Sequence, residues 1–163
     1  MIAIDGLLSL GDRVGSRLQE RGETVAVADG SSGGLIATAL LSRPGASAYF
    51  LGGATIYTRS AARGLLAGAV PAPADLRGAS EPWARYLAES IAVRLGATWG
   101  IGEGGASGPS GNPYGDPAGH AWIGVFGPTT ATRHVLTRDT ERTANMLTFA
   151  SAALELLLEH LRD

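Results

Sequence analysis

Hydrophobic and polar positions along the first forty residues follow two different patterns. Leu7, Val14 and Leu18 recur at helical spacing and lead to a basic turn followed by Gly22, which predicts an N-terminal helix. The next residues form a short apolar run, then a run of Gly and Ser, then a second apolar run. We therefore expect a buried strand at 24–28, a turn at 29–34 and a helix at 35–41.

The remainder of the chain continues this alternation and ends in a hairpin and a long helix. The pattern predicts, in order, a strand over 48–57 interrupted at Gly52-Gly53, a helix over 59–66, a helix capped by Ser80 and running to Leu95, a strand over 98–102 ending in Glu103, a hairpin of 120–126 and 132–137, and a helix over 140–161. Helices that alternate with strands before a final hairpin are typical of an α/β fold. We expect a single domain over 1–163, a layered sandwich with a mixed, partly parallel sheet flanked by helices.

A glycine-rich segment separates the last part of this pattern from the rest. Residues 104–119 contain six Gly and three Pro. A loop of that length is uncommon in a compact domain unless it is functional or disordered. This loop and the turn at 29–34 both follow predicted strands. Because ligands bind at the carboxyl ends of strands in open α/β sheets, we expect the two loops to meet at one pocket.

Composition narrows the chemistry that such a pocket can perform. The chain has no Cys and no Lys among its 163 residues. Thiolate nucleophiles, Schiff bases and a Walker lysine are therefore excluded, and a nucleophile must be Ser, Thr, Tyr, a carboxylate or activated water. A net charge of −2 with scattered Arg residues gives no electrostatic footprint for nucleic acid. The apolar runs are too short to span a membrane and the N-terminal residues lack a signal peptide's basic region, so we expect a cytoplasmic protein.

Several polar side chains near the expected pocket have two interpretations. The hydroxyl groups of Ser31 and Ser32 are suited to binding a phosphate or an oxyanion, or only to capping the next helix. Tyr57 ends a strand, where it orients a ligand or packs at the rim of the sheet. Glu103 acts as a base, holds a ribose, or is an ordinary carboxylate at the end of a strand.

Two further features concern metals and assembly. Asp116, His120 and His134 match no known spacing of metal ligands, so we expect no metal site. The closing helix has a very wide apolar face, which is either deep core or partly covered by another subunit. We expect a homo-oligomer, and a monomer mass from light scattering would contradict that expectation.

The run AVADGSSGGLIATALLSRPGASAYFLGGATIY at 26–57 resembles the beginning of the C-terminal domain of the competence/damage-inducible CinA family. The resemblance continues in order through GASE at 78–81, GASGP at 105–109 and GHAWI at 119–123, so it covers nearly the whole chain. This family is known for nicotinamide-nucleotide amidohydrolase activity. The resemblance implies hydrolysis of the carboxamide of nicotinamide mononucleotide to the acid and ammonia, by acyl transfer to a serine, with no metal or organic cofactor.

The resemblance also implies that the partner is a small nucleotide-like molecule whose phosphate lies on glycine-rich backbone. The residues that we expect to contact this ligand come from both glycine-rich loops and from the segment between them: Gly30, Gly33, Gly34, Ser47, Arg63, Glu103, Gly105, Gly108 and Asn112.

Three reactive positions of the family differ in this chain. The family's serine nucleophile falls on Gly30, and the lysine five residues after Tyr57 falls on Ala62. The threonine that precedes the second glycine-rich loop falls on Gly104. The resemblance therefore covers the scaffold more completely than the chemistry.

Two hypotheses about function remain open. In the first, the protein is still an amidohydrolase, with Ser31 or Ser32 as a displaced nucleophile, Tyr57 assisting, and Arg63 replacing the charge of the lost lysine. Arg stays protonated and cannot act as a general base, so this activity should be weak. In the second, the protein is a non-catalytic nucleotide-binding or protein-interaction module on the same scaffold.

Overall fold

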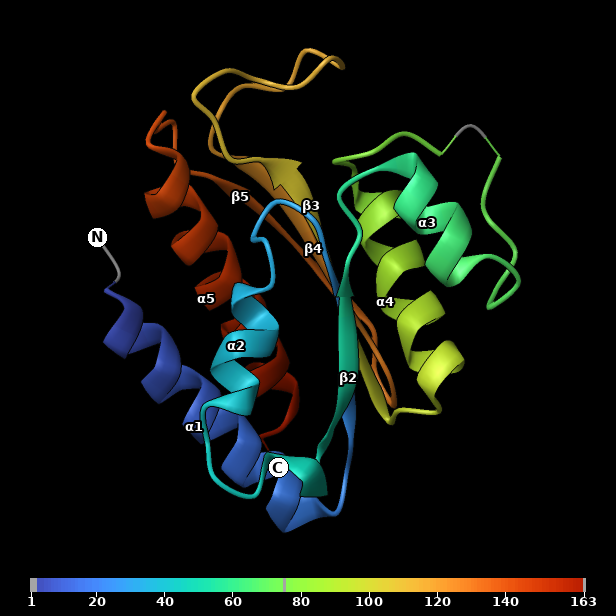
Figure 1. Cartoon of the computed structure of the whole chain (residues 1–163), viewed down its shortest axis with the longest axis vertical. Helices are drawn as coiled ribbons and strands as arrows, with labels where there is room; N and C mark the ends of the chain where they lie inside the picture. Colours follow the sequence, from blue (N-terminus) through green and yellow to red (C-terminus); the bar gives the residue numbers. More distant parts are fainter. Residues whose placement is uncertain (1–2, 75, 163) are drawn as a thin grey trace.

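Five strands form one mixed sheet (Figure 1): β1 (Val25–Asp29), β2 (Phe50–Thr55), β3 (Trp99–Ala106), β4 (His120–Phe126) and β5 (Ala131–Leu136). The computed structural model describes residues 3–74 and 76–162, and the strand order in the sheet is β2-β1-β3-β4-β5. β1 runs parallel to β2 and to β3, whereas β4 is antiparallel to both of its neighbours. The predicted α/β fold, with a sheet that is parallel first and antiparallel later, is confirmed.

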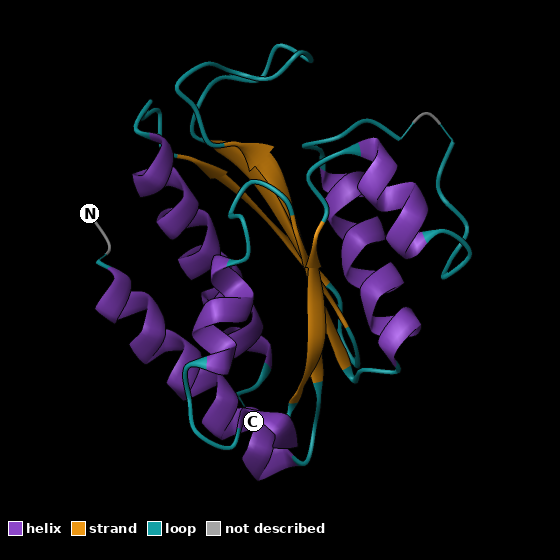
Figure 2. Ribbon diagram, viewed as in Figure 1, coloured by secondary structure: helices purple, strands orange, loops and turns teal. Residues whose placement is uncertain are grey.

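Helices cover both faces of this sheet (Figure 2). One face carries α1 (Ile4–Arg21), α2 (Leu35–Leu41) and α5 (Arg142–His160), and the other carries α3 (Arg59–Leu66) and α4 (Glu81–Leu95). A short 3-10 helix, Ala46–Ala48, precedes β2. The predicted helix ends agree well with the structure: Gly22 closes α1 in the left-handed conformation, and the Ser80 hydroxyl caps α4 by accepting from the Trp83 N–H.

Alternation along the strands divides the core into two parts. On β1, Val25 and Val27 pack with residues of α1, α2 and α5, whereas Ala26 and Ala28 pack with residues of α3 and α4. Because successive side chains of a strand point to opposite faces, the same alternation carries Asp29, at the end of β1, to the face of α2 and α5.

The wide apolar face of α5 is buried within the chain itself. α5 lies between the sheet on one side and α1 and α2 on the other. Phe149, Leu154 and Leu157 are fully buried by these neighbours. Of the two interpretations of this face, the structure supports deep core. The apolar face of α5 is therefore no argument for a second subunit, and the homo-oligomer stays a prediction.

Two details of the strands differ from the sequence prediction. β3 does not end at Glu103 but continues to Ala106, because Gly104 and Gly105 pair with Trp122 and Ala121 of β4. The irregular loop therefore begins at residue 107 instead of 104. The interruption predicted at Gly52-Gly53 lies earlier: both glycines are paired within β2, and the register shifts between Phe50 and Gly52.

Glycines on β3 let α4 lie directly on the sheet. A Cβ atom at Gly100 would overlap the carbonyl oxygen of Ala88, and one at Gly102 would overlap the carbonyl oxygen of Ala84. A Cβ at Gly124 of β4 would lie 2.7 Å from that same Ala84 oxygen. Backbone thus packs on backbone, and α4 is held close to the strands that form the edge of the cavity described below.

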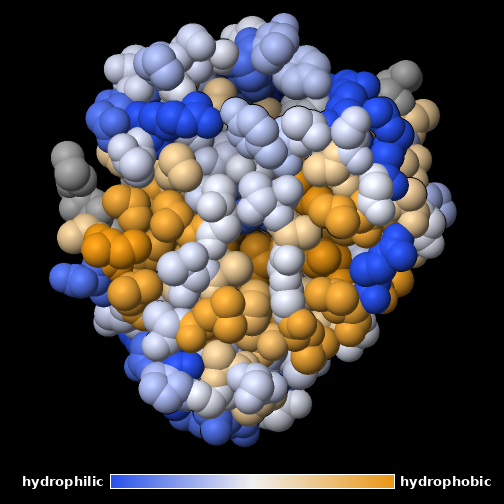
Figure 3. Space-filling model, in the orientation of Figure 1, coloured by the Kyte–Doolittle hydropathy of each residue, from blue (hydrophilic) through white to orange (hydrophobic). Residues whose placement is uncertain are grey.

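The surface of the molecule is unevenly polar. Figure 3 shows hydrophilic residues over the loops at the upper end and apolar surface lower down, over α1 and α2. Ile4 and Leu41 are among the exposed apolar side chains of these two helices. Among residues 3–74 and 76–162, no helix has the length and hydropathy needed to cross a bilayer.

The close packing of α4 gives a test of stability. Gly100→Ala should lower the free energy of unfolding by about 1–3 kcal/mol, because α4 must move away from β3 to admit the methyl group. Gly64→Ala is the matched control: a Cβ at Gly64 in α3 meets no atom within 4 Å, so that substitution should raise stability by about 0.5–1 kcal/mol. Urea unfolding measures both, and equal effects of the two variants would contradict the packing.

Candidate functional site

A cavity of about 810 Å³ lies beyond the carboxyl ends of the parallel strands β1, β2 and β3, on the face covered by α3 and α4. Gly30 and Ser31 line it from the turn after β1, and Gly105 lines it from the end of β3. The Ser107 hydroxyl donates to the carbonyl oxygen of Ser31 at 2.7 Å and ties the second glycine-rich loop to the first. The expectation that the two loops meet at one pocket is confirmed.

The carboxyl group of Glu103 lies behind this turn and is fully buried. Its Oε2 atom accepts hydrogen bonds from the N–H groups of Gly30, at 3.1 Å, and Ser32, at 2.9 Å. Its Oε1 atom accepts from the hydroxyl of Ser31. One side chain of β3 therefore fixes three consecutive residues of the turn after β1.

Asp29 fixes the other half of the turn and is also buried. Its carboxyl group accepts from the Gly34 N–H at 2.7 Å and from the Thr55 hydroxyl at 3.1 Å. The Ser32 hydroxyl lies between the two acids, 3.0 Å from Asp29 Oδ2 and 2.9 Å from Glu103 Oε2. A hydroxyl has one proton to donate, so it cannot donate to two ionised carboxylates at once. One proton held by either acid satisfies both contacts.

Burial raises the pKa of both acids. For Glu103, loss of solvation is the largest cause and the charge of Asp29 adds to it, while hydrogen bonds from Ser31 and Ser32 act in the opposite direction. For Asp29, loss of solvation again raises the pKa, against hydrogen bonds from Gly34, Ser32 and Thr55. Each of these two buried acids therefore holds its proton to a higher pH than an exposed carboxyl group does.

The glycine N–H groups of the turn are bonded within the protein and do not face an added anion. Those of Gly30 and Gly34 are bonded to the two carboxyl groups, and that of Gly33 donates to the carbonyl oxygen of Gly30 at 3.2 Å. The expectation that these glycines present free N–H groups to a phosphate is therefore wrong. The protein's own carboxyl groups occupy the position that the sequence pattern suggested for a ligand.

Aromatic side chains of α4 form another wall of the cavity. The ring centroids of Trp83 and Tyr86 lie 5.9 Å apart, and both residues line the cavity. The Trp83 indole lies against Gly104, where a Cβ atom would be 2.8 Å from Cδ1 and 3.0 Å from Nε1. Within the described part of the chain the indole N–H has no acceptor, so it is available to a molecule in the cavity.

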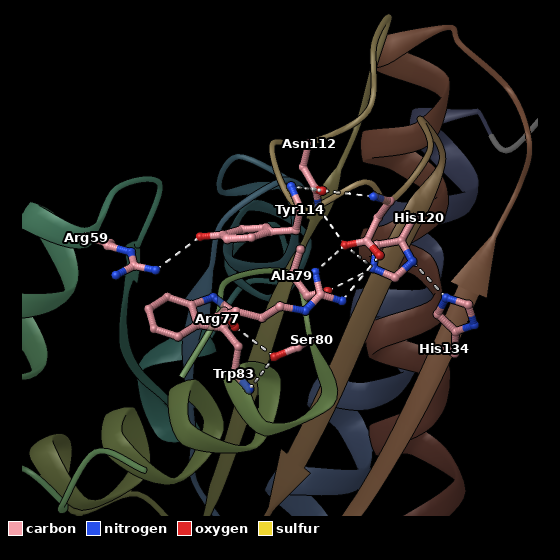
Figure 4. A network of polar contacts seen from close by, with 10 residues as sticks. Arg59, Arg77, Ala79, Ser80, Trp83, Asn112, Tyr114, His120 and His134 are labelled. Atoms are coloured by element: carbon pink, nitrogen blue, oxygen red, sulfur yellow. Dashed lines mark hydrogen bonds and ion pairs between the residues drawn. The ribbon is translucent and has the colours of Figure 1, made fainter. Parts of the chain in front are cut away.

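A polar network holds the loop after β3 against the segment before α4 (Figure 4). Arg77 donates to both carboxyl oxygens of Asp116, at 2.6 and 3.3 Å, and lies over the ring of Tyr114, 5.3 Å from its centroid. The Tyr114 hydroxyl lies 3.3 Å from Nη2 of Arg59 in α3 and accepts its hydrogen bond. Tyr114 thus connects the loop to α3 beside the cavity.

His120 continues this network into the sheet. Its Nε2 atom lies 2.8 Å from the carbonyl oxygen of Ala79, and its Nδ1 atom lies 2.9 Å from Nε2 of His134. Since a carbonyl oxygen only accepts, Nε2 of His120 is the donor to Ala79, and one proton lies between Nδ1 of His120 and Nε2 of His134. Asp116 lies 3.6 Å from His120 Nε2, so these three residues form a chain of contacts. The part of the molecule that the structure describes holds no group of three or more such side chains arranged for a metal ion.

Residues 8–161 match the family model described as the CinA C-terminal domain. The chain belongs to this family. It is 37% identical over 151 residues to a CinA-like protein of Synechocystis sp., which covers 91% of this chain and 36% of the relative. It is 38% identical over 155 residues to a CinA-like protein of Desulfosudis oleivorans, covering 94% of this chain and 37% of the relative. The chain thus spans little more than a third of the length of these relatives.

Solved structures of the CinA superfamily have the same fold. A competence/damage-inducible protein from Agrobacterium tumefaciens superposes with a TM-score of 0.86 at 27% identity, covering 96% of each chain. A CinA superfamily protein from Escherichia coli superposes with a TM-score of 0.87 over 98% of this chain and 93% of that chain; at 21% identity it shows the fold alone.

The CinA fold gathers only part of the residue set that the sequence predicted. Six of the predicted residues line the cavity: Gly30, Ser31, Tyr57, Arg63, Gly105 and Asn112. The others lie outside its lining: Ser32, Gly33, Gly34, Ser47, Glu103 and Gly108.

The residues outside the lining lie there for different reasons. Ser47 is in the 3-10 helix before β2, whereas the cavity lies beyond the carboxyl end of that strand. Glu103 and Ser32 are fully buried behind the turn. The carbonyl oxygen of Gly108 accepts from Arg142 at 2.6 Å, and Arg142 also donates to the hydroxyl of Tyr57 at 3.2 Å.

Sequence reasoning missed several residues of this CinA cavity. Trp83, Tyr86 and Tyr114 supply its aromatic walls, and Arg59 lines it from α3. A signal was present for Trp83, which follows the Ser80 cap and so begins a helix near the edge of the sheet. No periodicity indicated Tyr114, because its place depends on the fold of an irregular loop.

The buried acids predict an unusual dependence of stability on pH. A carboxyl group whose pKa is higher in the folded than in the unfolded state stabilises the fold while it is protonated. This contribution is complete below about pH 4 and is lost as pH rises through the folded-state pKa. The free energy of unfolding of the wild type minus that of Glu103→Gln should therefore fall as pH rises from about 4. Urea unfolding across pH measures this difference.

Asp116→Asn is the control, because its effect on the free energy of unfolding should change with pH in the opposite direction. Arg77 lowers the pKa of Asp116 to about 2, so its contribution is present above about pH 4 and lost as pH falls toward the folded value. A wild type minus Glu103→Gln difference that rose with pH, as it should for Asp116, would contradict the buried acid pair.

Proposed function

We propose that this CinA-family chain binds a small nucleotide-like molecule in the cavity and lacks the serine–lysine chemistry associated with the family. One observation carries the proposal: Gly30 and Ala62 both line the cavity. These are the positions on which the resemblance places the serine nucleophile and the lysine that activates it. A cavity with Gly and Ala there keeps room for a ligand but has neither reactive group.

The form of the cavity supports a ligand of this kind. Its volume of about 810 Å³ lies within the usual range for small-molecule sites, about 300–1,000 Å³. Aromatic side chains such as Trp83 suit a planar ring, and Arg59 and Arg63 in its lining suit an anionic group. A cytoplasmic location, where such nucleotides occur, is part of this proposal.

Calorimetric titration with nicotinamide mononucleotide tests the binding. The wild type should bind, and Arg63→Ala should weaken affinity about tenfold, the loss of one charged hydrogen bond. Arg13→Ala is the matched control, because Arg13 is an exposed residue of α1 on the other side of the sheet, and it should leave affinity unchanged. No heat of binding together with no rise in melting temperature would reject this class of ligand.

Ammonia release is the second measurement on the same samples. We expect none from the wild type above a buffer blank, since Gly30 and Ala62 cannot perform the acyl transfer. The double variant Gly30→Ser with Ala62→Lys should gain activity: a Cβ at Gly30 would lie 3.2 Å from the Ile56 carbonyl oxygen and 3.4 Å from that of Glu103, so the backbone must move by a few tenths of an ångström to admit it. Ammonia release by the wild type that equals the double variant would contradict the assignment of these two positions.

A further inference from the structure

The cavity wall holds a second serine whose surroundings differ from those of the family position. We propose that Ser31 accepts acyl groups from carboxylic esters in the cavity, with Glu103 as the general base. This inference adds a reaction to the proposed function and rests on it only in using the same cavity.

Ser31 has both access and a base. It lines the cavity and retains 7% of its accessible surface. Its hydroxyl donates to Oε1 of Glu103, the proton transfer contact that a serine nucleophile requires. Ser32 has no access: it is fully buried, and its hydroxyl lies between the two carboxyl groups.

The carboxyl group of Glu103 is held for this role by its other contacts. The N–H groups of Gly30 and Ser32 both bond to Oε2, which leaves Oε1 to Ser31. Asp29 is a positioning residue, linked to Glu103 through the Ser32 hydroxyl. Burial raises the pKa of Glu103, which makes its carboxylate a stronger base than an exposed one.

The reaction balances with these groups alone. The Ser31 oxygen bonds to the ester carbonyl carbon while its proton passes to Glu103. The bond between that carbon and the alcohol oxygen then breaks, and the leaving alkoxide takes the proton from Glu103, which leaves an acyl ester on Ser31. Water attacks this ester and gives a proton to Glu103, which returns it to the departing Ser31 oxygen as the carboxylic acid is released.

Two donors are available for the negative oxygen of the intermediate. Neither the backbone N–H of Ser31 nor the indole N–H of Trp83 has an acceptor among residues 3–74 and 76–162, and both residues line the cavity. Donors of this type stabilise the developing charge of a tetrahedral intermediate. An ester is favoured over an amide as substrate because its alkoxide leaves without a lysine to protonate it.

The test uses p-nitrophenyl acetate with the full chain. The wild type should release a burst of p-nitrophenolate, and peptide mass spectrometry should find the acetyl group on Ser31. Because the chain has no Lys and no Cys, side-chain amines and thiols do not compete for the reagent. Ser31→Ala should abolish the burst, and Ser9→Ala, at an exposed position of α1 on the other side of the sheet, should leave it unchanged.

Glu103→Gln separates a general base from a structural contact. The amide keeps the shape of the side chain but accepts no proton, so the burst should slow by about 100-fold or more. The burst rate of the wild type should fall as pH falls through the raised pKa of Glu103, and the variant should lose this dependence. An equal burst in Glu103→Gln, with the same pH profile, would overturn the role of Glu103.

A thiol variant separates access from reactivity. Ser31→Cys introduces the single thiol of the chain, and iodoacetamide should alkylate it if the side chain is reachable from the cavity. Alkylation of this variant without acetylation of wild-type Ser31 would overturn the proposal, as would a thiol that resists alkylation.

The nucleotide titration keeps the two proposals distinguishable. Acetylation of Ser31 in a protein that does not bind nicotinamide mononucleotide would support the ester chemistry and reject the ligand. Binding of nicotinamide mononucleotide without acetylation of Ser31 would support the ligand and reject the ester chemistry. If both hold, saturating nucleotide should slow acetylation of Ser31 in the wild type.

Discussion

The arrangement of the site depends on the hydrogen bonds of the Glu103 carboxyl group. They join β3 to the turn after β1, which the parallel pairing of these strands brings side by side. Burying a charged group is costly unless its oxygens are bonded, and here four donors converge on two oxygens. The same contact therefore shapes the turn and sets the protonation of the acids.

The sheet separates the two halves of the site. Its α3–α4 face carries the cavity, whereas the side chains of Asp29 and Glu103 lie with the α2–α5 face behind the turn. Ser31 sits where the two halves meet, since it lines the cavity and bonds to Glu103. A buried charge can then act on a cavity that it does not enter.

Much of this arrangement was readable from the sequence. The order of strands and helices, the Ser80 cap and the meeting of the two glycine-rich loops follow from periodicity and turn residues, which are local signals. Glu103 was a candidate base from the sequence, but its contacts with the turn after β1 and the place of Tyr114 were not readable, because each depends on partners more than fifty residues away. The sequence likewise could not show that the Gly30 N–H is bonded to Glu103, because this acid comes from a distant strand.

The glycines of β3 and β4 have a mechanical consequence for the cavity. Helix backbone rests directly on strand backbone at Gly100 and Gly102, and Leu87 and Ile91 of α4 pack in the same buried cluster as Ala26 and Ala28 of β1. A shift of the wall that carries Trp83 would therefore break these close contacts. α3 also lines the cavity, and this eight-residue helix has mostly exposed side chains, so fewer contacts oppose its displacement. Molecules of different width would be accommodated on the α3 side while the ring-binding wall kept its place.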